Sequence, residues 1–197
     1  MSETRSYPRH IRSDAGEIEF RLMARSDEAA VLAFAQKLPT HDLLFLPRNI
    51  SQPKVLSAWI NEIERGAIKS LLAVKGGEVV GCGTVVRDPY SWSPHVGEIR
   101  MVVSLDIRGI GVGRALSQET FALALDAGLE KMSVQMTVDQ QAAIALFEGL
   151  GFKAEALLRD HVRDVEGKKH DIVVLGHNVA QVRAQMEAYG LPGAVQQ

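Results

Sequence analysis

Apolar and polar residues alternate in several short stretches of the chain, which is the period of a strand with one buried face. From Glu17 to Leu22 every second residue is apolar, and the same alternation returns from Met132 to Val138. Because successive side chains on a strand point to opposite faces, both stretches predict half-buried strands. Further strands are expected at about 68–74, 79–86, 97–103, 153–163 and 169–176, with a Gly76-Gly77 hairpin between the first two.

Capping residues and helix breakers predict four helices between these strands. Ser26 is a suitable N-cap for the first helix, which should end near Leu38 because Pro39 follows. The second helix follows Pro53 and should end near Gly66. Two more helices are expected at about 112–127 and 140–150, the latter with Gly151 as its C-cap.

The mixed order of strands and helices predicts one α/β domain, of the α+β kind with a mixed sheet. We expect this domain to span residues 17–180. The polar residues 1–16 are expected to form a flexible N-terminal arm, and residues 181–197 a C-terminal tail with a short helix. A chain of 197 residues can bury one ordinary hydrophobic core.

The composition narrows the classes of function. Lys and Arg total 22 against 24 for Asp and Glu, a net charge of -2, whereas nucleic-acid binders usually carry a basic excess. Cys82 is the only cysteine, so an internal disulfide or a cysteine-based metal site is excluded. No stretch has the pattern of a membrane span or a signal peptide. We therefore expect a cytoplasmic protein without metal, membrane or nucleic-acid partners, and leave a homodimer open.

The segment from Arg108 to Arg114 has three alternating glycines between a predicted strand and a predicted helix. Glycine adopts backbone angles that other residues avoid, and it lets a ligand approach the main chain closely. The first amides of a helix have no partner within it, so this turn suits a phosphate or pyrophosphate. A Walker loop is excluded because Gly113 is followed by Arg114 and Ala115, and the dinucleotide pattern G-x-G-x-x-G is not met either.

The pattern Arg108-x-x-Gly111-x-Gly113 resembles the coenzyme A pyrophosphate loop of the GNAT N-acetyltransferase superfamily. The two signatures of that superfamily occur here in order and span about residues 96–153. The resemblance implies a GNAT-like acyl-CoA N-acyltransferase fold with about seven strands and four helices. It also implies an acyltransferase that uses acetyl-CoA as co-substrate. The second signature, common as Asn-x-x-Ala-x-x-Leu-Tyr-x-x-x-Gly-Phe, is matched between Asp139 and Phe152 at Ala143, Leu146, Gly151 and Phe152.

The resemblance also implies which residues bind the cofactor. Main-chain groups of the fourth strand would pair with the pantetheine arm in a gap beside the fifth strand. A backbone amide near Val102 or Val103 would polarise the thioester carbonyl, as in an oxyanion hole. The implied strand residues are Met101, Val102 and Val103, and the implied loop residues are Arg108, Gly109, Ile110, Gly111, Val112, Gly113 and Arg114.

Glu98 is the candidate general base. It matches a fourth-strand glutamate that serves as base in part of the superfamily, and it falls on the opposite strand face from Ile99 and Met101. A base is needed because an ammonium substrate must lose its proton before the amine attacks. The alternative is a structural glutamate paired with Arg100 or another arginine. The sequence does not decide between these two interpretations.

Two positions of the second signature differ from the common pattern. Gln140 stands where asparagine is frequent, and its amide can still bind the pantetheine arm. Phe147 stands where a tyrosine often protonates the leaving thiolate, and phenylalanine has no proton to give. A thiol titrates near 8.5, so the thiolate is a tolerable leaving group without that tyrosine. Phe147 can also be explained by core packing at helical spacing with Ala143 and Leu150.

On the acceptor side, the resemblance implies a pocket formed by residues 40–49, the loop at 90–95 and the last hairpin. Arg48 or Arg163 would suit the carboxylate of an amino acid. The lining candidates, for which ordinary packing is the alternative, are Leu44, Phe45, Tyr90 and Trp92.

Three functions are compatible with these observations. The first is acetylation of a small-molecule amine, such as an amino acid or a polyamine-like amine. The second is acetylation of a protein N-terminus or lysine, which an open peptide groove would favour. The third is a non-catalytic coenzyme A sensor, which the phenylalanine at position 147 favours and the retained Glu98 and glycine loop disfavour.

Overall fold

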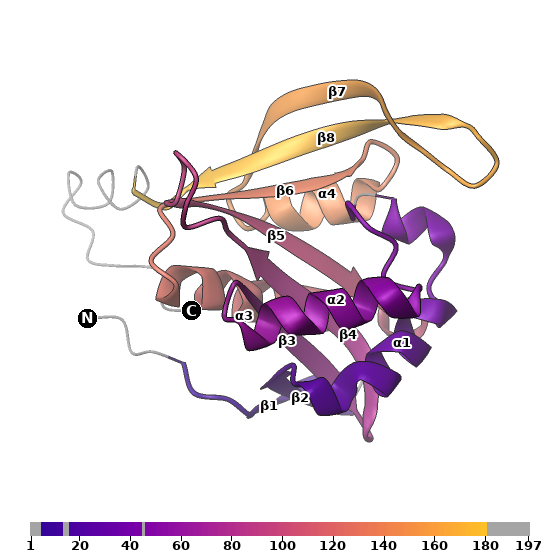
Figure 1. The fold of residues 1–197 in the computed structure, drawn as a ribbon, viewed down its shortest axis with the longest axis vertical. Coiled ribbons are helices and arrows are strands. Elements are labelled where there is room, and N and C mark those ends of the chain that lie inside the picture. Colours follow the sequence, from indigo (N-terminus) through magenta and orange to yellow (C-terminus); the bar gives the residue numbers. More distant parts are fainter. Residues whose placement is uncertain (1–4, 14–15, 45, 181–197) are drawn as a thin grey trace.

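The computed structural model describes residues 5–13, 16–44 and 46–180, which form an eight-stranded sheet with helices on both faces (Figure 1). The strand order is β1-β2-β3-β4-β5-β6-β8-β7. Neighbouring strands are antiparallel except β5 and β6, which are parallel. The strands are β1 Arg9–Ser13, β2 Gly16–Leu22, β3 Ile68–Lys75, β4 Glu78–Val86, β5 Val96–Val103, β6 Lys131–Thr137, β7 Lys153–Arg163 and β8 Lys169–Asn178.

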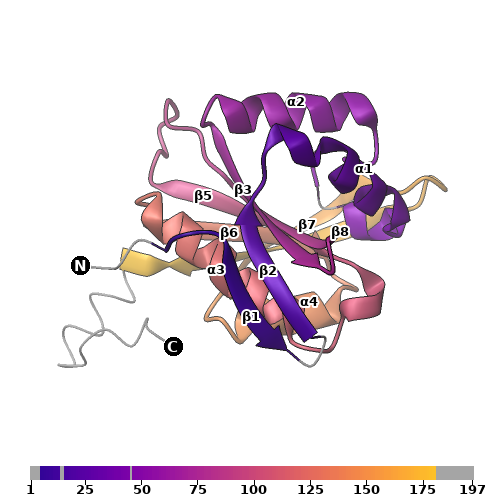
Figure 2. The same cartoon turned by 90° about the horizontal axis from the view of Figure 1, so that it is seen from below.

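Two helices lie on each side of the sheet. Figure 2 shows α1 and α2 over one face and α3 and α4 over the other. The prediction of a mixed α/β fold with four helices is confirmed, with eight strands in place of about seven. The helices are α1 Glu28–Lys37, α2 Pro53–Glu64, α3 Val112–Asp126 and α4 Gln141–Glu148, with short 3-10 turns η1 Arg25–Asp27, η2 Thr40–Leu43 and η3 Leu105–Ile107.

Strand β1 is the additional strand, and it lies where the sequence predicts a flexible arm. It pairs antiparallel with the edge of β2, from Arg9 opposite Phe20. Residues before β1 contact α3 through Glu119. The Tyr7 hydroxyl donates a hydrogen bond to the Glu119 carboxylate at 3.1 Å, and Arg5 forms an ion pair with it at 2.8 Å. The sequence of β1 is polar and has no strand pattern. Its position depends on these non-local partners, so local sequence reasoning did not predict it. The tail at 181–197 lies outside the described residues.

The start of the first helix differs from its prediction. Ser26 lies inside the 3-10 turn, and Asp27 is the N-cap of α1. The Asp27 carboxylate accepts the Ala24 amide at 2.9 Å and binds both terminal nitrogens of Arg21 on β2, at 2.7 and 2.8 Å. Asp27 thus joins the start of α1 to β2 and also makes a local capping contact with Ala24, three residues earlier. The prediction of Ser26 as N-cap missed both contacts. The other helices begin and end within two residues of their predicted limits.

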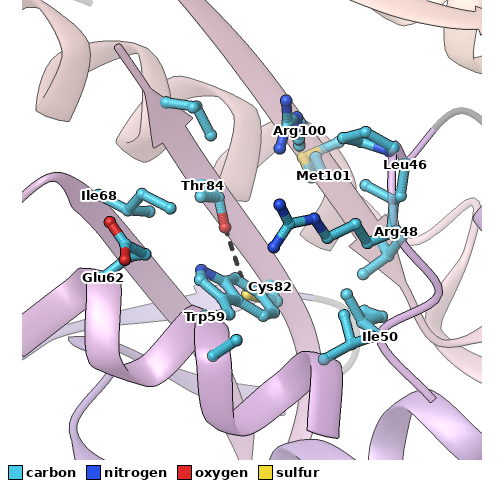
Figure 3. A pocket seen from close by; sticks show the side chains of 15 residues that line it. Leu46, Arg48, Ile50, Trp59, Glu62, Ile68, Cys82, Thr84, Arg100 and Met101 are labelled. Carbon is cyan, nitrogen blue, oxygen red and sulfur yellow. Dashed lines mark hydrogen bonds between the residues drawn. The ribbon is translucent and has the colours of Figure 1, made fainter. Parts of the chain in front are cut away.

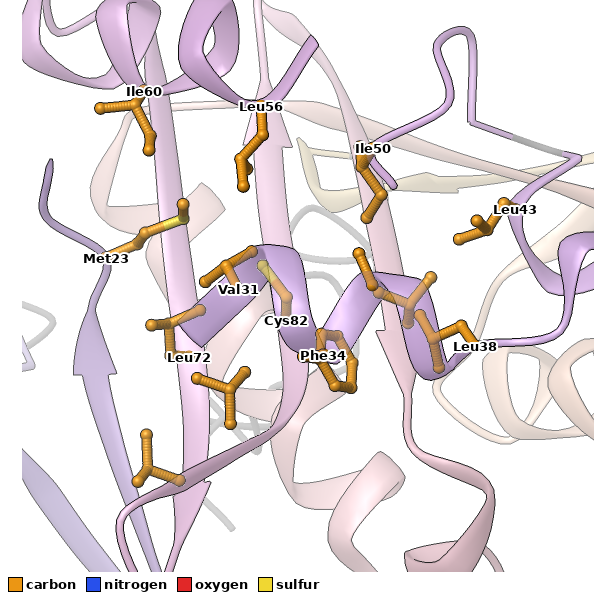
Figure 4. Packing of buried hydrophobic residues seen from close by; sticks show 14 residues of the cluster. Met23, Val31, Phe34, Leu38, Leu43, Ile50, Leu56, Ile60, Leu72 and Cys82 are labelled. Atoms are coloured by element: carbon orange, nitrogen blue, oxygen red, sulfur yellow. The ribbon is translucent and has the colours of Figure 1, made fainter. Parts of the chain in front are cut away.

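Buried apolar side chains fill the space between the sheet and both helix layers. Figure 4 shows the cluster under α1 and α2, where Val31 and Phe34 of α1 and Leu56 and Ile60 of α2 pack on the sheet. Further clusters lie between the sheet and α3 and α4. Burying such side chains is the main favourable contribution to folding. The fold therefore has apolar packing on both faces of its central strands.

The parallel pair β5 and β6 is joined over only a short length. Its register contains three residue pairs, from Val96 opposite Lys131 to Glu98 opposite Ser133. After these pairs the strands diverge (Figure 1), while β6 continues to pair with β8 as far as Thr137. The diverging ends of β5 and β6 leave main-chain groups of residues 99–103 without a β6 partner. This opening is the structural basis of the candidate active site.

Candidate active site

The turn from η3 into α3 has the conformation that its glycines predict. Gly109 and Gly111 have φ angles of +77° and +84°, in the left-handed region that favours glycine. Gly111 is the N-cap of α3, and the first helical bond runs from the Ala115 amide to the Gly111 carbonyl oxygen at 3.0 Å. The amides of residues 112–114 therefore have no partner within the helix. Amides in this position attract an anion.

These residues line a cavity of about 560 Å³ between the divergent strands and α4. Every residue that the sequence assigns to the cofactor lies on its wall except Ile110 and Val112. The side chains of these two residues pack in the core beneath the turn, so only their main chain faces outward. The assigned residues on the wall are Met101, Val102, Val103, Arg108, Gly109, Gly111, Gly113, Arg114, Gln140 and Phe147.

Arg108 is held by contacts within the protein. Its Nη2 donates to Asp42 Oδ2 at 2.7 Å and to the Val103 carbonyl oxygen at 2.9 Å. Asp42 belongs to η2, so this contact ties the segment after α1 to the glycine turn. Arg114 is exposed and makes no ion pair with a residue that the structure describes. Of the two arginines, Arg114 has the unengaged positive charge.

The two unusual positions of the second signature take different places in this cavity. Gln140 precedes α4, and its side-chain oxygen accepts the Thr137 amide at 3.3 Å. Phe147 is 5% exposed and meets Phe152 edge to face, with ring centroids 5.3 Å apart. The interpretation of Phe147 as a core-packing residue is therefore confirmed. It nevertheless contributes to the cavity wall, where it supplies apolar surface and no proton.

A second cavity, of about 420 Å³, lies on the side of the sheet covered by α2 (Figure 3). Met101 and Val102 line both cavities, so the two spaces lie on either side of the same part of β5. Trp59 and Glu62 of α2 form one wall, and Arg48 extends from the preceding loop. The remaining lining residues are Leu46, Pro47, Ile50, Val55, Ala58, Ile68, Cys82, Thr84, Val86 and Arg100.

A family model described as the acetyltransferase (GNAT) family matches residues 37–152. This range contains the glycine turn, the divergent strands and most residues of both cavities. The chain belongs to the acetyltransferase (GNAT) family. The superfamily resemblance of the two sequence signatures is thus confirmed.

Curated relatives match part of the chain. A probable N-acetyltransferase family 8 member 5 from Mus musculus is 36% identical over 84 residues, which are 42% of this chain and 37% of the relative. A mycothiol acetyltransferase from Paenarthrobacter aurescens is 35% identical over 85 residues, 42% of this chain and 26% of the relative. The matched region thus spans little more than a third of these relatives at most.

Solved structures resemble the fold over most of the chain. A GNAT-family acetyltransferase from Streptococcus pneumoniae has a TM-score of 0.71 and 21% identity, and covers 82% of this chain and 99% of its own. A putative acetyltransferase from Salmonella typhimurium, solved with its cofactor acetyl-CoA, has a TM-score of 0.70 and 18% identity over 82% of this chain and 94% of its own. At these identities the comparison establishes the GNAT fold.

Glu98 lies on β5, two residues before Arg100 of the second cavity. Its two carboxylate oxygens accept hydrogen bonds from Arg100 Nε and Nη2, at 2.9 and 3.0 Å. Arg100 in turn lines the cavity. The ion pair that the sequence leaves as an alternative is therefore present. It does not exclude a role as base, because each carboxylate oxygen has a further lone pair for a water or an ammonium group.

The structure corrects several predictions about the acceptor side. Tyr90 and Trp92 are 98% and 101% exposed, because their loop stands away from the sheet. Leu44 and Arg163 do not line the second cavity, whereas Arg48 does. Phe45 lies outside the described residues. Sequence reasoning missed the lining residues of α2 and β4, whose apolar pattern is also that of ordinary core residues: Val55, Ala58, Trp59, Glu62, Cys82, Thr84 and Val86.

Cys82 lies opposite Val102 in the wall of the second cavity, and its environment keeps its thiol unreactive. Burial raises the pKa of its thiol to about 12, and a hydrogen bond with Thr84 only partly offsets this. The thiolate, and not the thiol, is the nucleophile. Cys82 therefore serves as a small apolar wall residue at neutral pH. Among the described residues no cluster suited to a metal ion occurs, and no helix has the length and hydrophobicity of a membrane span.

Proposed function

We propose that this protein transfers the acetyl group of acetyl-CoA to the primary amine of a small molecule. The observation that carries the proposal is the pair of cavities on opposite sides of β5, which share Met101 and Val102 as a common wall. The cavity with the anion-attracting turn would be the cofactor cavity. The second cavity has the size of a small-molecule site and would be the acceptor-side cavity. The acetyl-CoA in the Salmonella structure of the same fold supports this choice of donor.

The residues of the first cavity fit the parts of acetyl-CoA, which would supply the reactive thioester. The amides of residues 112–114 and the open turn at Gly109 and Gly111 would hold the pyrophosphate, with Arg114 adding positive charge. The main-chain groups of residues 99–103 that face away from β4 and have no β6 partner would bind the pantetheine arm, and Gln140 would bind it from the side of α4. A backbone amide near Val102 or Val103 would stabilise the developing oxyanion.

Proton transfer needs a base on the acceptor side and an acid on the donor side. Glu98 would receive the ammonium proton, directly or through a water, while Arg100 fixes the carboxylate orientation. Phe147 cannot protonate the thiolate, so water would do so. Protonation of the leaving thiolate is the less demanding of the two steps. A thiol titrates near 8.5, so the thiolate is a tolerable leaving group.

The first experiment is release of free coenzyme A across a panel of amines, amino acids and peptides, with Glu98→Gln and Arg100→Gln in parallel. A base contributes about 10²- to 10⁴-fold, so Glu98→Gln should lower kcat by about that factor while the affinity for coenzyme A stays the same. Arg100→Gln retains the carboxylate and should lower kcat much less. A Glu98→Gln enzyme with the kcat of the wild-type protein would contradict the role of Glu98 as base.

A coenzyme A sensor is the second candidate, and the aromatic core position of Phe147 favours it. The two functions differ in one measurable respect. A sensor would bind coenzyme A by titration calorimetry, and no acceptor in the panel would raise its release above background. Turnover on small amines, absent on peptides with a free N-terminus or lysine, would support the proposed function over the sensor and over a protein acetyltransferase.

A further inference from the structure

The acceptor-side cavity combines apolar walls with an uneven distribution of charge. Trp59, Ile68 and Val86 provide large apolar surfaces on its walls (Figure 3). Its charged side chains are Arg48 and Arg100 near Met101, and Glu62 on the opposite side at α2. The three groups differ in how far other residues neutralise them, and this difference indicates the chemistry of the acceptor.

Two of these charges already have partners. Arg100 donates two hydrogen bonds to Glu98, and Arg65 forms an ion pair with Glu62, three residues earlier, at 3.1 Å. Arg48 differs from both. It makes no ion pair with any residue that the structure describes, and Figure 3 shows its guanidinium group extending over the cavity toward Thr84. The cavity thus offers one cation without a counter-charge.

A free guanidinium group at the cavity selects among small amines. A guanidinium binds a carboxylate through two parallel hydrogen bonds, whereas it repels a second cation. Arg48 lies beside Met101, which is part of the wall shared with the cofactor cavity. An acceptor with its carboxylate close to its reacting amine therefore satisfies the site, and a polyamine does not.

The apolar walls determine what the rest of the acceptor must be. With its carboxylate on Arg48, an acceptor would extend its remaining atoms across Trp59 and toward Ile68. Apolar surface in such a cavity is favourably removed from water. Resting on the proposed acetyl transfer, we infer that the acceptor is a free α-amino acid with a large apolar side chain, whose carboxylate is bound by Arg48.

The test compares L-phenylalanine with 2-phenylethylamine, which differ only in the carboxylate. For the wild-type protein we expect kcat/KM to be about 10- to 100-fold higher for the amino acid, the range of one charge-assisted interaction. Arg48→Ala should reduce this preference to near unity by lowering activity on L-phenylalanine alone. Arg48→Lys, which keeps the charge without the planar fork, should restore part of it.

A binding experiment separates failure of this inference from failure of the proposed transfer. Titration of L-phenylalanine into the wild-type protein saturated with coenzyme A should show binding that Arg48→Ala weakens about tenfold or more, whether or not acetyl transfer occurs. Trp59→Ala should weaken the binding of L-phenylalanine more than the binding of L-alanine. Equal kcat/KM for the two test amines, a preference for spermidine, or binding unchanged in Arg48→Ala would overturn the inference while leaving acetyl transfer intact.

Discussion

Single residues decide whether the turn before α3 can receive a ligand. The Cβ positions that Gly109 and Gly111 lack would meet nothing within 4 Å. These glycines are therefore required by their positive φ angles and not by crowding within the protein. The same open space leaves the adjacent amides accessible. A side chain at either position would strain the turn and cover the surface where an anion would lie.

The first prediction compares Gly111→Ala with Gly128→Ala. Gly128 has a φ angle of +76° and equally open surroundings, but it lies at the other end of α3, away from the cofactor cavity. Each variant should lose about 1–2 kcal/mol of stability through the strained backbone. Only Gly111→Ala should also weaken coenzyme A binding, by about tenfold or more in a calorimetric titration. Equal losses of affinity in both variants would show that the turn has no direct role.

At the scale of secondary-structure elements, α1 depends on an ionic contact with the sheet. The Arg21 guanidinium group is the largest influence on Asp27, and it holds the pKa of the buried carboxyl below its ordinary value. A carboxyl group with a lowered pKa in the folded state stabilises the fold above its unfolded pKa, about 3.9. That contribution is lost as the pH falls through the lower, folded pKa.

The second prediction uses Asp27→Asn, which keeps one oxygen for the Ala24 amide and removes the negative charge. The amide also puts an N–H₂ donor in place of one oxygen that accepts from Arg21. We expect the free energy of unfolding to fall by about 2 kcal/mol at pH 7. Because the wild-type carboxyl loses its charge in acid, the difference should shrink below about pH 4. Urea unfolding at pH 7 and pH 3 measures both values. A difference that is the same at both pH values would attribute the effect to shape and not to charge.

At the scale of the whole molecule, η2 connects the two sides of the divergent strands. Asp42 of this segment binds Arg108 at the glycine turn, and His41 binds Asp139 before α4 at 2.8 Å. Asp42 and Asp139 both line the cofactor cavity. Two carboxylates thus lie on the wall of a cavity proposed to receive a polyanion, and one of them engages an arginine of the turn.

The third prediction concerns Asp42→Asn. Removing this charge frees Arg108 and makes the cavity less negative, so coenzyme A should bind about 3- to 10-fold more tightly at low ionic strength, and the gain should shrink at high salt. Asp106→Asn is the matched control, because its exposed carboxylate lies near the same turn and binds Ser104 in place of an arginine. Weaker binding in Asp42→Asn would instead mean that Asp42 positions Arg108 for the ligand.

The sequence by itself determined the order of the elements and the glycine turn at which we propose that the cofactor binds. A strand, an alternating glycine turn and a helix start are local requirements of the backbone, so residues 108–114 and the strand before them are visible without a structure. The residues of β5 and of the turn line one cavity because they are close in the sequence and therefore stay close in space. The same reasoning failed for β1 and Asp27, whose partners lie on other elements.

Only the tertiary structure decided which residues line the second cavity. Arg48, Trp59, Thr84 and Arg100 come from a loop, a helix and two strands, and the order of the strands together with the packing of α2 brings them around one cavity. In sequence, Trp59 has the pattern of a core residue and Arg48 that of a solvated loop residue. Whether such side chains face a core, water or a ligand depends on how α2 packs over the sheet, and that packing is a sum of distant contacts that no local pattern records.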